Sequence, residues 1–512
     1  MICPKLYFTK EDVLFMNDII RYFNEECIRK FLDLREKLYE DPENLAGFIR
    51  DIRKETDEIA RRTIQQVIQE MNDLIKRMPD RKEKWVVERK GDAKRLTTSV
   101  GDIIFQKTLY KSKTEVNDQG KPLQCYLVDK VLGLSPNQTM TEDAVANILT
   151  EAVQTSYRKG GEAASPDGVT RGTVKNLLHG LKFPEGPMTP RRKKEVSYLY
   201  IEADEDHYHL QFNDHRGDLE RDSAGRKING AITKLIYVHE GLEPEAPKSK
   251  RYRLVSPHYF CRGEETDNKT LWEEVCSYIR ENYDVKKIKR IYLNSDGGPW
   301  IQTVRGKMAG ITFVLDGYHL SKYVSKLTRH MEDSSEDARS EIYDSIRSKT
   351  KEDFFNVVER LKECADTDKI RGRIDEAARY IVANWTAAKY RLKRSEGVIG
   401  SSTEGHVYHV LSSRMSTLPM GWSRLGGSQM ARLREYYYNG GSMVELARYQ
   451  KEELPLAAGA EETVLSATKT LRSEKTKRTK ELQEYGKYSE TMRGSLSAQG
   501  AKKLIFQLRG KI

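Results

Sequence analysis

Residues 287–300, KIKRIYLNSDGGPW, carry the pattern around which the rest of the chain is organised. Ile288 and the apolar run 291–293 have the length of a short buried strand, and residues 294–298 end that strand in a turn. An acid at the carboxyl end of a buried strand, followed by glycines that let a ligand approach the backbone, is typical of α/β active sites. Asp296 is therefore the first candidate site residue, although Asp-Gly-Gly is also ordinary turn chemistry.

Two further stretches each place an acid at the end of a predicted element. Residues 196–212, VSYLYIEADEDHYHLQF, predict a hairpin of two short strands whose connecting turn holds Asp204, Glu205 and Asp206. Residues 400–423, GSSTEGHVYHVLSSRMSTLPMGWS, predict a helix that Ser402 or Thr403 caps and that carries Glu404 in its first turn. Taken singly, Asp204 is explained as a hairpin acid and Glu404 as a favourable charge at a helix start.

Composition limits the classes of protein to which the chain can belong. Its 512 residues are 38% hydrophobic and 32% charged, which predicts three or four folded units. The net charge of +11 favours a polyanionic partner, with nucleic acid as the leading candidate. The chain has no run of eighteen apolar residues and no signal-peptide pattern, so we expect a soluble cytoplasmic protein without a membrane partner. Six scattered cysteines indicate neither a zinc site nor a disulfide framework.

Periodicity and turn residues divide the chain into seven segments, which together predict a multidomain α+β fold. They are an amphipathic helical region (1–84), a small β module (85–139), a helix-turn-helix region (140–186), the first part of a mixed-sheet core (187–329), a helical insertion (330–395), the completion of the core (396–450) and a basic tail (451–512). The N-terminal helices either pair with a partner chain or pack on the domain behind them. We expect the polar tail to be mobile and to lie on DNA.

The helix-turn-helix interpretation rests on three predicted helices, the last of which covers 169–178 and has Thr170 as its cap. Any small three-helix unit produces the same pattern. If the unit binds DNA, its packed face is apolar and the polar residues of the last helix point outward. The candidate DNA-binding residues are Arg171, Thr173, Lys175 and Asn176, followed by the basic linker residues Arg191, Arg192, Lys193 and Lys194.

The three acids suit one kind of chemistry when they are taken together. Hard divalent cations prefer carboxylate ligands, and phosphate-cleaving sites often gather acids around two ions about 3.5–4 Å apart. Asp204, Asp296 and Glu404 would then hold two Mg2+ (or Mn2+) ions. One ion would activate a water or a DNA 3′-hydroxyl, and the other would stabilise the leaving oxygen.

Four segments resemble bacterial insertion-sequence transposases of the Lre type (IS-Lre-two), formerly an uncharacterised protein family. They are YLYIEADEDHYHLQ (198–211), YLNSDGGPWI (292–301), FVLDGYHLSKY (313–323) and STEGHVYHVLSSRMSTLPMGWS (402–423). The resemblance implies an RNase H-like core with a DDE triad and a helical insertion before the final glutamate, broadly similar to Mutator-like transposases. It also implies that Asp204, Asp296 and Glu404 are the catalytic metal ligands, and that Asp316 and His319 form an acid-x-x-His pair near the site.

Several assignments remain open at this level. Glu202, Glu205 and Asp206 surround Asp204, so the first acid is fixed only to within two positions. His406 and His409 either support the site or contact DNA phosphate, or they pack within their helix. Trp300 and Trp422 either stack on a displaced base or pack in the core.

The predicted function is that of a Mg2+-dependent DNA transposase. Its predicted partners are double-stranded DNA, both element ends and target, and further copies of the chain assembled on that DNA. The alternatives are a structure-selective nuclease without strand transfer and a catalytically silent DNA-binding repressor.

Overall fold

The structure is a computed structural model that describes residues 22–117, 119–184, 192–308, 310–348, 350–452 and 460–476. The chain divides into two compact units. Unit 1 comprises Met1–Val145, Ala164–Gly168 and Lys451–Ile512, and unit 2 comprises Ala146–Ala163 and Val169–Gln450. Each unit therefore combines several of the seven segments predicted from the sequence.

Unit 1 contains the small β module that the sequence predicted. Its antiparallel sheet has the order β1 (Trp85–Thr98), β2 (Gly101–Val116), β3 (Pro122–Tyr126). Alternating side chains of the first two strands point into one core, where Trp85, Leu96 and Phe105 are each 1% exposed. The short helices α4 (Pro79–Lys84) and α5 (Leu127–Val131) flank the sheet.

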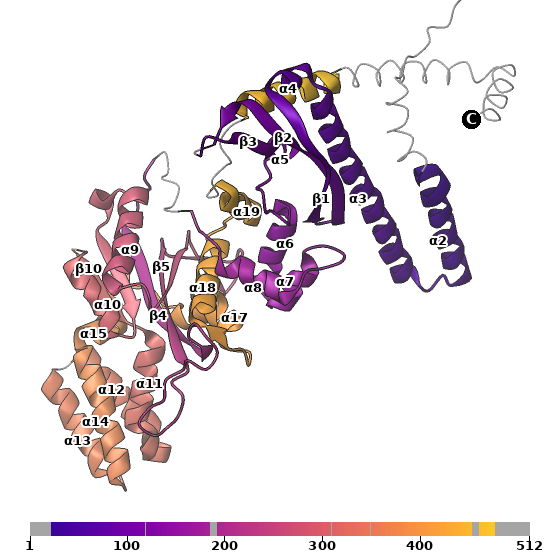
Figure 1. The fold of residues 1–512 in the computed structure, drawn as a ribbon. Helices are drawn as coiled ribbons and strands as arrows, with labels where there is room; N and C mark the ends of the chain where they lie inside the picture. Colours follow the sequence, from indigo (N-terminus) through magenta and orange to yellow (C-terminus); the bar gives the residue numbers. More distant parts are fainter. Residues whose placement is uncertain are drawn as a thin grey trace, which may run out of the picture. The chain divides into compact units, whose positions relative to one another are not determined.

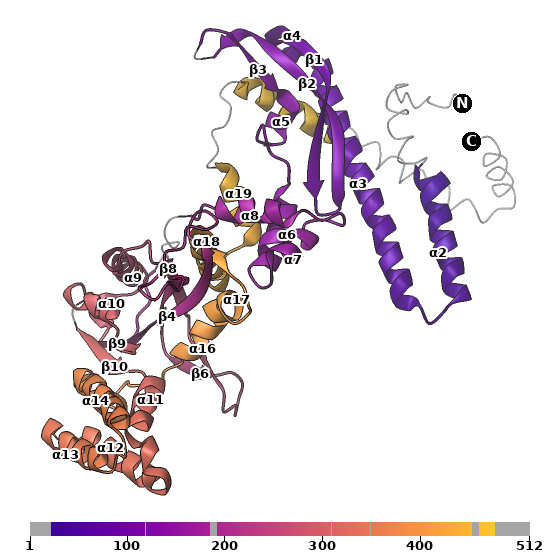
Figure 2. The same ribbon diagram turned by 60° about the horizontal axis from the view of Figure 1, so that its bottom comes forward.

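The long helix α3 (Leu45–Arg77) lies beside β1 and β2 (Figure 2). The side-chain oxygens of Gln65, Gln69 and Asn72 accept hydrogen bonds from the backbone N–H groups of Ile104, Gln106 and Thr108, at 2.9–3.2 Å. These donors precede the part of β2 that pairs with β3, so α3 satisfies strand groups that β3 does not reach. Of the two alternatives for the N-terminal helices, pairing with a partner chain or packing on the domain behind them, α3 follows the second. Before α3, the chain forms the π-helix η1 (Phe23–Cys27) and the helix α2 (Ile28–Glu40).

The expectation that the tail is mobile is wrong for residues 460–476. Residues 461–476 form a helix, and Ala460 and Ala467 are 1% exposed members of the unit 1 core. The indole N–H of Trp85 donates a hydrogen bond to Thr463 Oγ1 at 3.0 Å. Sequence polarity did not reveal this packing because the helix buries small side chains. Residues 477–512 lie outside the described part of the chain.

A mixed sheet forms the centre of unit 2, which confirms the predicted α+β architecture. Its spatial order is β10 (Ile311–Leu315), β9 (Arg290–Ser295), β4 (Tyr198–Phe212), β5 (Gly230–His239), β8 (His258–Gly263). The pairs β10/β9 and β9/β4 are parallel, whereas β4/β5 and β5/β8 are antiparallel. Numbered along the chain and read from β8 to β10, these five strands have the order 3-2-1-4-5. A two-residue strand, β11 (Trp422–Ser423), pairs with β4, and β6 (Leu242–Pro244) pairs with β7 (Tyr252–Leu254) separately.

The predicted hairpin around Asp204 is wrong, because β4 is a single strand of 15 residues. Its pairing with β5 continues through the acids, with Asp204 opposite Leu235 and Asp206 opposite Thr233. The hydrogen bonds between β4 and β5 thus override the local turn propensity of residues 204–206. Because side chains alternate along a strand, Glu202, Asp204 and Asp206 project from the same face of the sheet.

Helices cover both faces of this sheet (Figure 1). Leu199 and Ile201 of β4 pack in one core with Trp272 and Ile279 of α9 (Asn268–Asn282). On the other face, α18 (Arg424–Tyr438) packs against β8, where Glu435 accepts a hydrogen bond from the N–H of Cys261 at 2.7 Å. The acids of β4 therefore lie on the face opposite α9.

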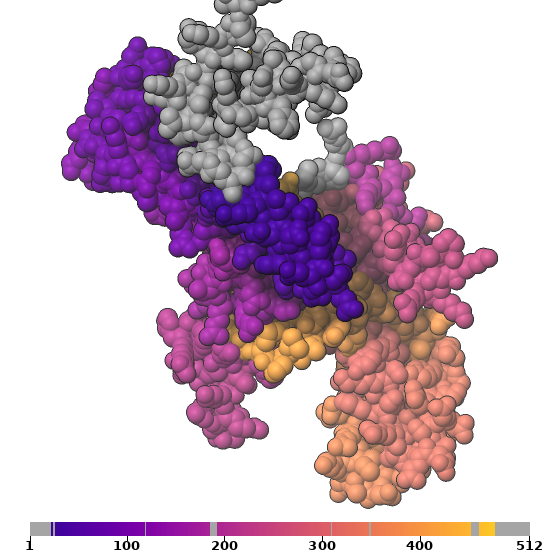
Figure 3. Space-filling model, turned by 90° about the vertical axis from the view of Figure 1, so that its right-hand side faces the viewer, coloured from indigo at the N-terminus to yellow at the C-terminus, as the bar shows by residue number. Residues whose placement is uncertain are grey.

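The predicted insertion is helical. It contains η4 (Arg329–Ser334), α12 (Ser335–Ser348), α13 (Lys351–Glu363), α14 (Asp368–Ala383) and α15 (Trp385–Lys393). Its apolar faces form a core with α11 (Gly317–Thr328) and with Leu315, the last residue of β10. Figure 3 shows these helices as a salmon and pale orange block. The block is thus packed directly onto the end of an edge strand of the sheet.

The three helices predicted for the helix-turn-helix region are α6 (Glu142–Ala152), α7 (Tyr157–Ala163) and α8 (Arg171–His179). Thr170 caps α8, since its hydroxyl oxygen accepts a hydrogen bond from the N–H of Thr173 at 3.2 Å. The two last helices meet closely, because a Cβ at Gly161 would lie 2.3 Å from the carbonyl oxygen of Val169. None of the helices in the described residues is long and apolar enough to cross a membrane.

Candidate functional site

The structure brings Asp204, Asp296 and Glu404 together from three elements. The parallel pairing of β4 with β9 ends at Ala203↔Ser295, so Asp204 and Asp296 occupy the next positions on neighbouring strands. Glu404 lies in the first turn of α16 (Thr403–Val407), which packs against β4. Glu404, which comes from the segment after the helical insertion, thus joins Asp204 and Asp296 of the sheet.

The charges of the three acids act on one another. Burial raises the pKa of Asp204 to about 7, and the charges of Asp296 and Glu404 add to this effect. The N–H of Glu205, which donates to Asp204 Oδ1 at 2.8 Å, and the nearby His319 act in the opposite direction. Within the described residues, no lysine or arginine forms an ion pair with any of the three acids. The site is therefore short of positive charge.

His319 is the basic side chain that lies beside these acids. Its Nδ1 lies 3.2 Å from Asp316 Oδ2, and its Nε2 lies 4.0 Å from Glu404 Oε1. The hydrogen bond with Asp316 raises the pKa of His319 against the effect of burial, and the charges of Asp204 and Asp296 contribute further. Asp316 also caps α11 by accepting a hydrogen bond from the N–H of His319 at 3.1 Å. The resemblance therefore pointed to a pair that lies at the acids.

The contacts of the neighbouring acids favour Asp204 as the first site acid. Asp206 accepts hydrogen bonds from the hydroxyls of Ser412 and Ser416, at 2.9 and 3.0 Å. Glu205 projects from the opposite face of β4 and lies 3.3 Å from His207 Nε2. Glu202 is completely buried and hydrogen-bonded by several groups. Asp204 alone combines accessibility with the influence of the other two acids.

Glu202 fixes the start of the helix that carries Glu404, a role that sequence reasoning missed. Its Oε2 accepts hydrogen bonds from the N–H of Ser402 at 3.1 Å, the hydroxyl of Ser401 at 3.2 Å, and the hydroxyl of Thr403. Burial alone would raise the pKa of Glu202, but His239, Thr403 and Tyr237 hold it below its usual value. Ser402 is the N-cap residue, as predicted, yet its side chain makes no capping bond. A strand carboxylate satisfies the helix start instead.

Arg391 of α15 ties the helical block to the ends of two strands and to the segment before α16. Its guanidinium donates to Leu315 O at 2.8 Å, Ile399 O at 2.6 Å and Asn294 Oδ1 at 2.7 Å. These acceptors lie next to the turns that carry Asp316, Glu404 and Asp296, respectively. Nothing in the local sequence singles out Arg391 among the many basic residues of the insertion.

The remaining predicted site residues lie in different surroundings. His406 packs between the rings of Tyr237 and Tyr259, with Nδ1 3.0 Å from the Tyr259 hydroxyl, and burial lowers its pKa to about 4. His409 is exposed. Thus the two histidines do not face the same surroundings, and His406 is a packing residue in this structure.

Of the two tryptophans, Trp422 does not fit the base-stacking interpretation. Trp422 is 6% exposed, donates its indole N–H to Met415 O at 3.0 Å and contacts Tyr157 edge-on, so it is a core residue. Trp300 is half-buried beside Trp272, and it lies two residues after Gly298, the second glycine that follows Asp296. A base therefore has no access to Trp422.

The predicted DNA-binding residues differ in their exposure and in their contacts with the rest of the protein. Arg171, Lys175 and Asn176 are exposed on α8, whereas Val174 and Leu178 are buried, as the helical pattern predicted. Thr173 instead lies 3.0 Å from the Thr170 hydroxyl. In the linker, Arg191 lies outside the described residues and Arg192 is exposed. Lys193 donates to Arg280 O and Lys194 pairs with Glu240, so both lysines have protein partners.

The acids do not form a finished metal site as they stand. In the described part of the chain, no group of three or more His, Cys, Asp or Glu side chains has the geometry to hold an ion. The chemistry of the donors nevertheless suits a hard divalent cation, because all three are carboxylates and none has a basic partner other than His319. The Glu404 side chain is 48% exposed, so its carboxylate is open to solvent and to an arriving ion.

Comparison with known proteins gives the chain a family. Residues 40–453 match the model described as Uncharacterised protein family (UPF0236). The chain belongs to this family. A UPF0236 protein of Caldanaerobacter subterraneus subsp. tengcongensis is 35% identical over 445 residues, which cover 87% of each chain. A second from the same organism is 36% identical over the same share of each chain. The names of these two UPF0236 relatives join eleven and four loci of one genome.

Proposed function

We propose that the protein is a DNA transposase that cleaves and joins phosphodiester bonds at the ends of its own element, with an RNase H-like DDE core. The observation that carries the proposal is the meeting of Asp204, Asp296 and Glu404 at one edge of the sheet, without a lysine or arginine partner in the described residues. The 3-2-1-4-5 strand order with an antiparallel second strand supports the RNase H-like assignment. The many loci of the relatives support a mobile element.

Asp204, Asp296 and Glu404 would hold two Mg2+ or Mn2+ ions. When bound, such ions activate the attacking oxygen and stabilise the leaving oxygen of an in-line displacement. The chain positions the three carboxylates by different means. Parallel pairing sets Asp204 beside Asp296, and Glu202 sets the start of the helix bearing Glu404. Asp316 orients His319 beside the acids, and its hydrogen bond raises the pKa of His319, which favours a positive charge next to the three carboxylates.

The proposal is tested with isosteric variants of the full chain. Asp204→Asn, Asp296→Asn and Glu404→Gln should each lower Mg2+-dependent cleavage of end-containing DNA roughly 100-fold or more, because each removes a carboxylate charge needed in the transition state. Binding to the same DNA should persist. Glu205→Gln is the matched control, since that side chain projects from the other face of β4.

Any one of the three variants that cleaves at the parental rate would remove its residue from the site. The joining step distinguishes a transposase from a nuclease. We expect the parent protein to join the cut end to a target plasmid. Cleavage without joined product would favour the nuclease, and end binding without cleavage would favour the repressor.

A further inference from the structure

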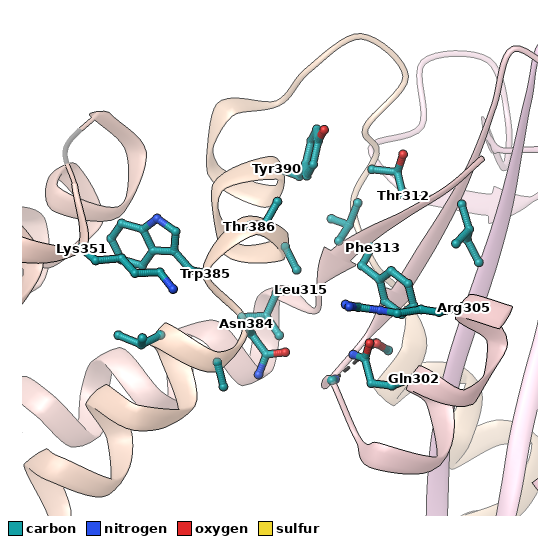
Figure 4. Close-up of a pocket in the computed structure, with 17 residues that line it drawn as sticks. Gln302, Arg305, Thr312, Phe313, Leu315, Lys351, Asn384, Trp385, Thr386 and Tyr390 are labelled. Carbon is teal, nitrogen blue, oxygen red and sulfur yellow. Dashed lines mark hydrogen bonds between the residues drawn. The ribbon is translucent and has the colours of Figure 1, made fainter. Parts of the chain in front are cut away.

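A cavity of about 370 Å³ lies between the sheet edge and the helical block, directly beside the turn of Asp296 (Figure 4). Ser295 and Gly297, the two neighbours of Asp296, line it. The other walls come from the end of α10 (Pro299–Gln302), from η3 (Thr303–Gly306), from β10, and from α13, α14 and α15. This volume is within the range of sites for small ligands, about 300–1,000 Å³.

One polar group of the wall lacks a partner. Gln302 Oε1 is buried and has no hydrogen-bond partner in the described structure. A buried acceptor without a donor destabilises the folded protein, and a rotation of the Gln302 amide toward the cavity would bring this oxygen to a ligand that donates to it. The amide also offers N–H donors, which suits the mixed donor and acceptor edge of a nucleobase.

The same walls offer positive charge and planar surfaces. Arg305 and Lys351 line the cavity from opposite sides and form no ion pair in the described part of the chain (Figure 4). The Arg305 guanidinium lies 4.6 Å from the centre of the Phe313 ring, an arrangement that holds the guanidinium plane in place. Tyr390 supplies a second aromatic ring. Bases stack on guanidinium planes and aromatic rings, and phosphates pair with free cations.

We propose that this cavity binds an unpaired deoxynucleotide, with its base edge on Gln302, its base plane near Arg305 and its phosphate on the two cations. The nucleotide belongs either to a DNA strand or to a free mononucleotide. Assigning it to the strand that passes the Asp296 turn rests on the proposed function, whereas binding of a nucleotide by the cavity does not.

The test measures the binding of a fluorescent single-stranded hexanucleotide to the full chain by anisotropy. Gln302→Leu and Arg305→Gln should each weaken binding roughly tenfold, the effect of losing one strong polar contact. Arg373→Gln, the same charge change at an exposed position of α14, should leave binding unchanged. The melting temperature of Gln302→Leu should equal or exceed that of the parent, because the variant removes an unsatisfied acceptor.

Two further ligands separate the sources. An abasic hexanucleotide should bind more weakly than the normal one, and competition by deoxyadenosine monophosphate at comparable concentration would identify a free nucleotide as the ligand. Parental binding by both cavity variants, or equal binding of the abasic strand, would overturn the proposal. A protein that binds the hexanucleotide through the cavity but does not cut DNA ends would contradict the proposed function alone.

Discussion

The carboxylate of Glu202 accepts a hydrogen bond from the backbone N–H of Ser402, 3.1 Å away, although 200 positions separate the two residues in the chain. The same carboxylate binds the hydroxyls of Ser401 and Thr403 and lies 3.5 Å from His239 Nε2. One buried group therefore joins the central strand to the start of the helix that carries Glu404.

Replacing Glu202 by Gln should impair the site without removing the DNA-binding surface. The amide keeps the size of the side chain but loses the charge that attracts the N–H and hydroxyl donors, and we expect a loss of about 2–3 kcal/mol in the free energy of unfolding. Urea denaturation and steady-state cleavage kinetics check this, with kcat falling and KM for DNA unchanged.

A pair of Thr403 variants provides the control for Glu202. Thr403 is 2% exposed, and its hydroxyl donates to the Glu202 carboxylate. Thr403→Ser keeps that donor and should retain most activity, whereas Thr403→Val should reproduce the loss of kcat. Equal activity of both variants would show that this contact does not position Glu404.

Arg391→Lys should loosen the junction between the helical block and the sheet. A lysine ammonium cannot reproduce the fixed fork that reaches Leu315 O, Ile399 O and Asn294 Oδ1 together. We expect a destabilisation of about 2–4 kcal/mol by chemical denaturation. Arg379→Lys is the control, because Arg379 is exposed and, among the residues that the structure describes, bonds only within its own helix. Equal stability of the two variants would contradict the role of Arg391.

The raised pKa of Asp204, about 7, predicts a pH-dependent stability without divalent cation. A folded-state pKa above the ordinary 3.8 means that the folded protein holds the proton more tightly than the unfolded chain. The stability that protonated Asp204 contributes is thus lost as the pH rises from about 4 to about 7. Asp204→Asn should melt at a higher temperature than the parent at pH 8, with a smaller difference at pH 5. An equal difference at both pH values would refute the shift.

Base reading and phosphate binding should separate on α8. Arg171 is exposed at the start of α8. If it bonds guanine as we propose, Arg171→Ala should cost about 1–3 kcal/mol on end DNA and little on unrelated DNA. Lys175→Ala should weaken binding to both duplexes and flatten the salt dependence, because we expect Lys175 to contact a phosphate. Titrations at two salt concentrations check both variants. If neither differs from the parent, α8 is structural and the β module is the next candidate reader.

Local pattern was sufficient for much of the architecture. The strand into Asp296, the cap at Thr170, the three helices around it and the small antiparallel module all follow from short-range periodicity and turn chemistry. Asp296 and Glu404 were also identifiable before their proximity was known, because acids at element ends have a recognisable sequence context. Asp204 was singled out on a hairpin that the structure does not contain, since it lies within the single strand β4.

Tertiary structure alone decided the features that depend on distant partners. Turn-forming residues around Asp204 continue as strand because β5 and β9 supply hydrogen bonds along both edges of β4, and local propensity cannot register those partners. The cap that Glu202 provides, the fork of Arg391 and the burial of Trp422 arise in the same way, from segments far apart in the chain. The sequence specified which groups were available for chemistry, and long-range pairing and packing decided which of them lie together and which are enclosed in the core.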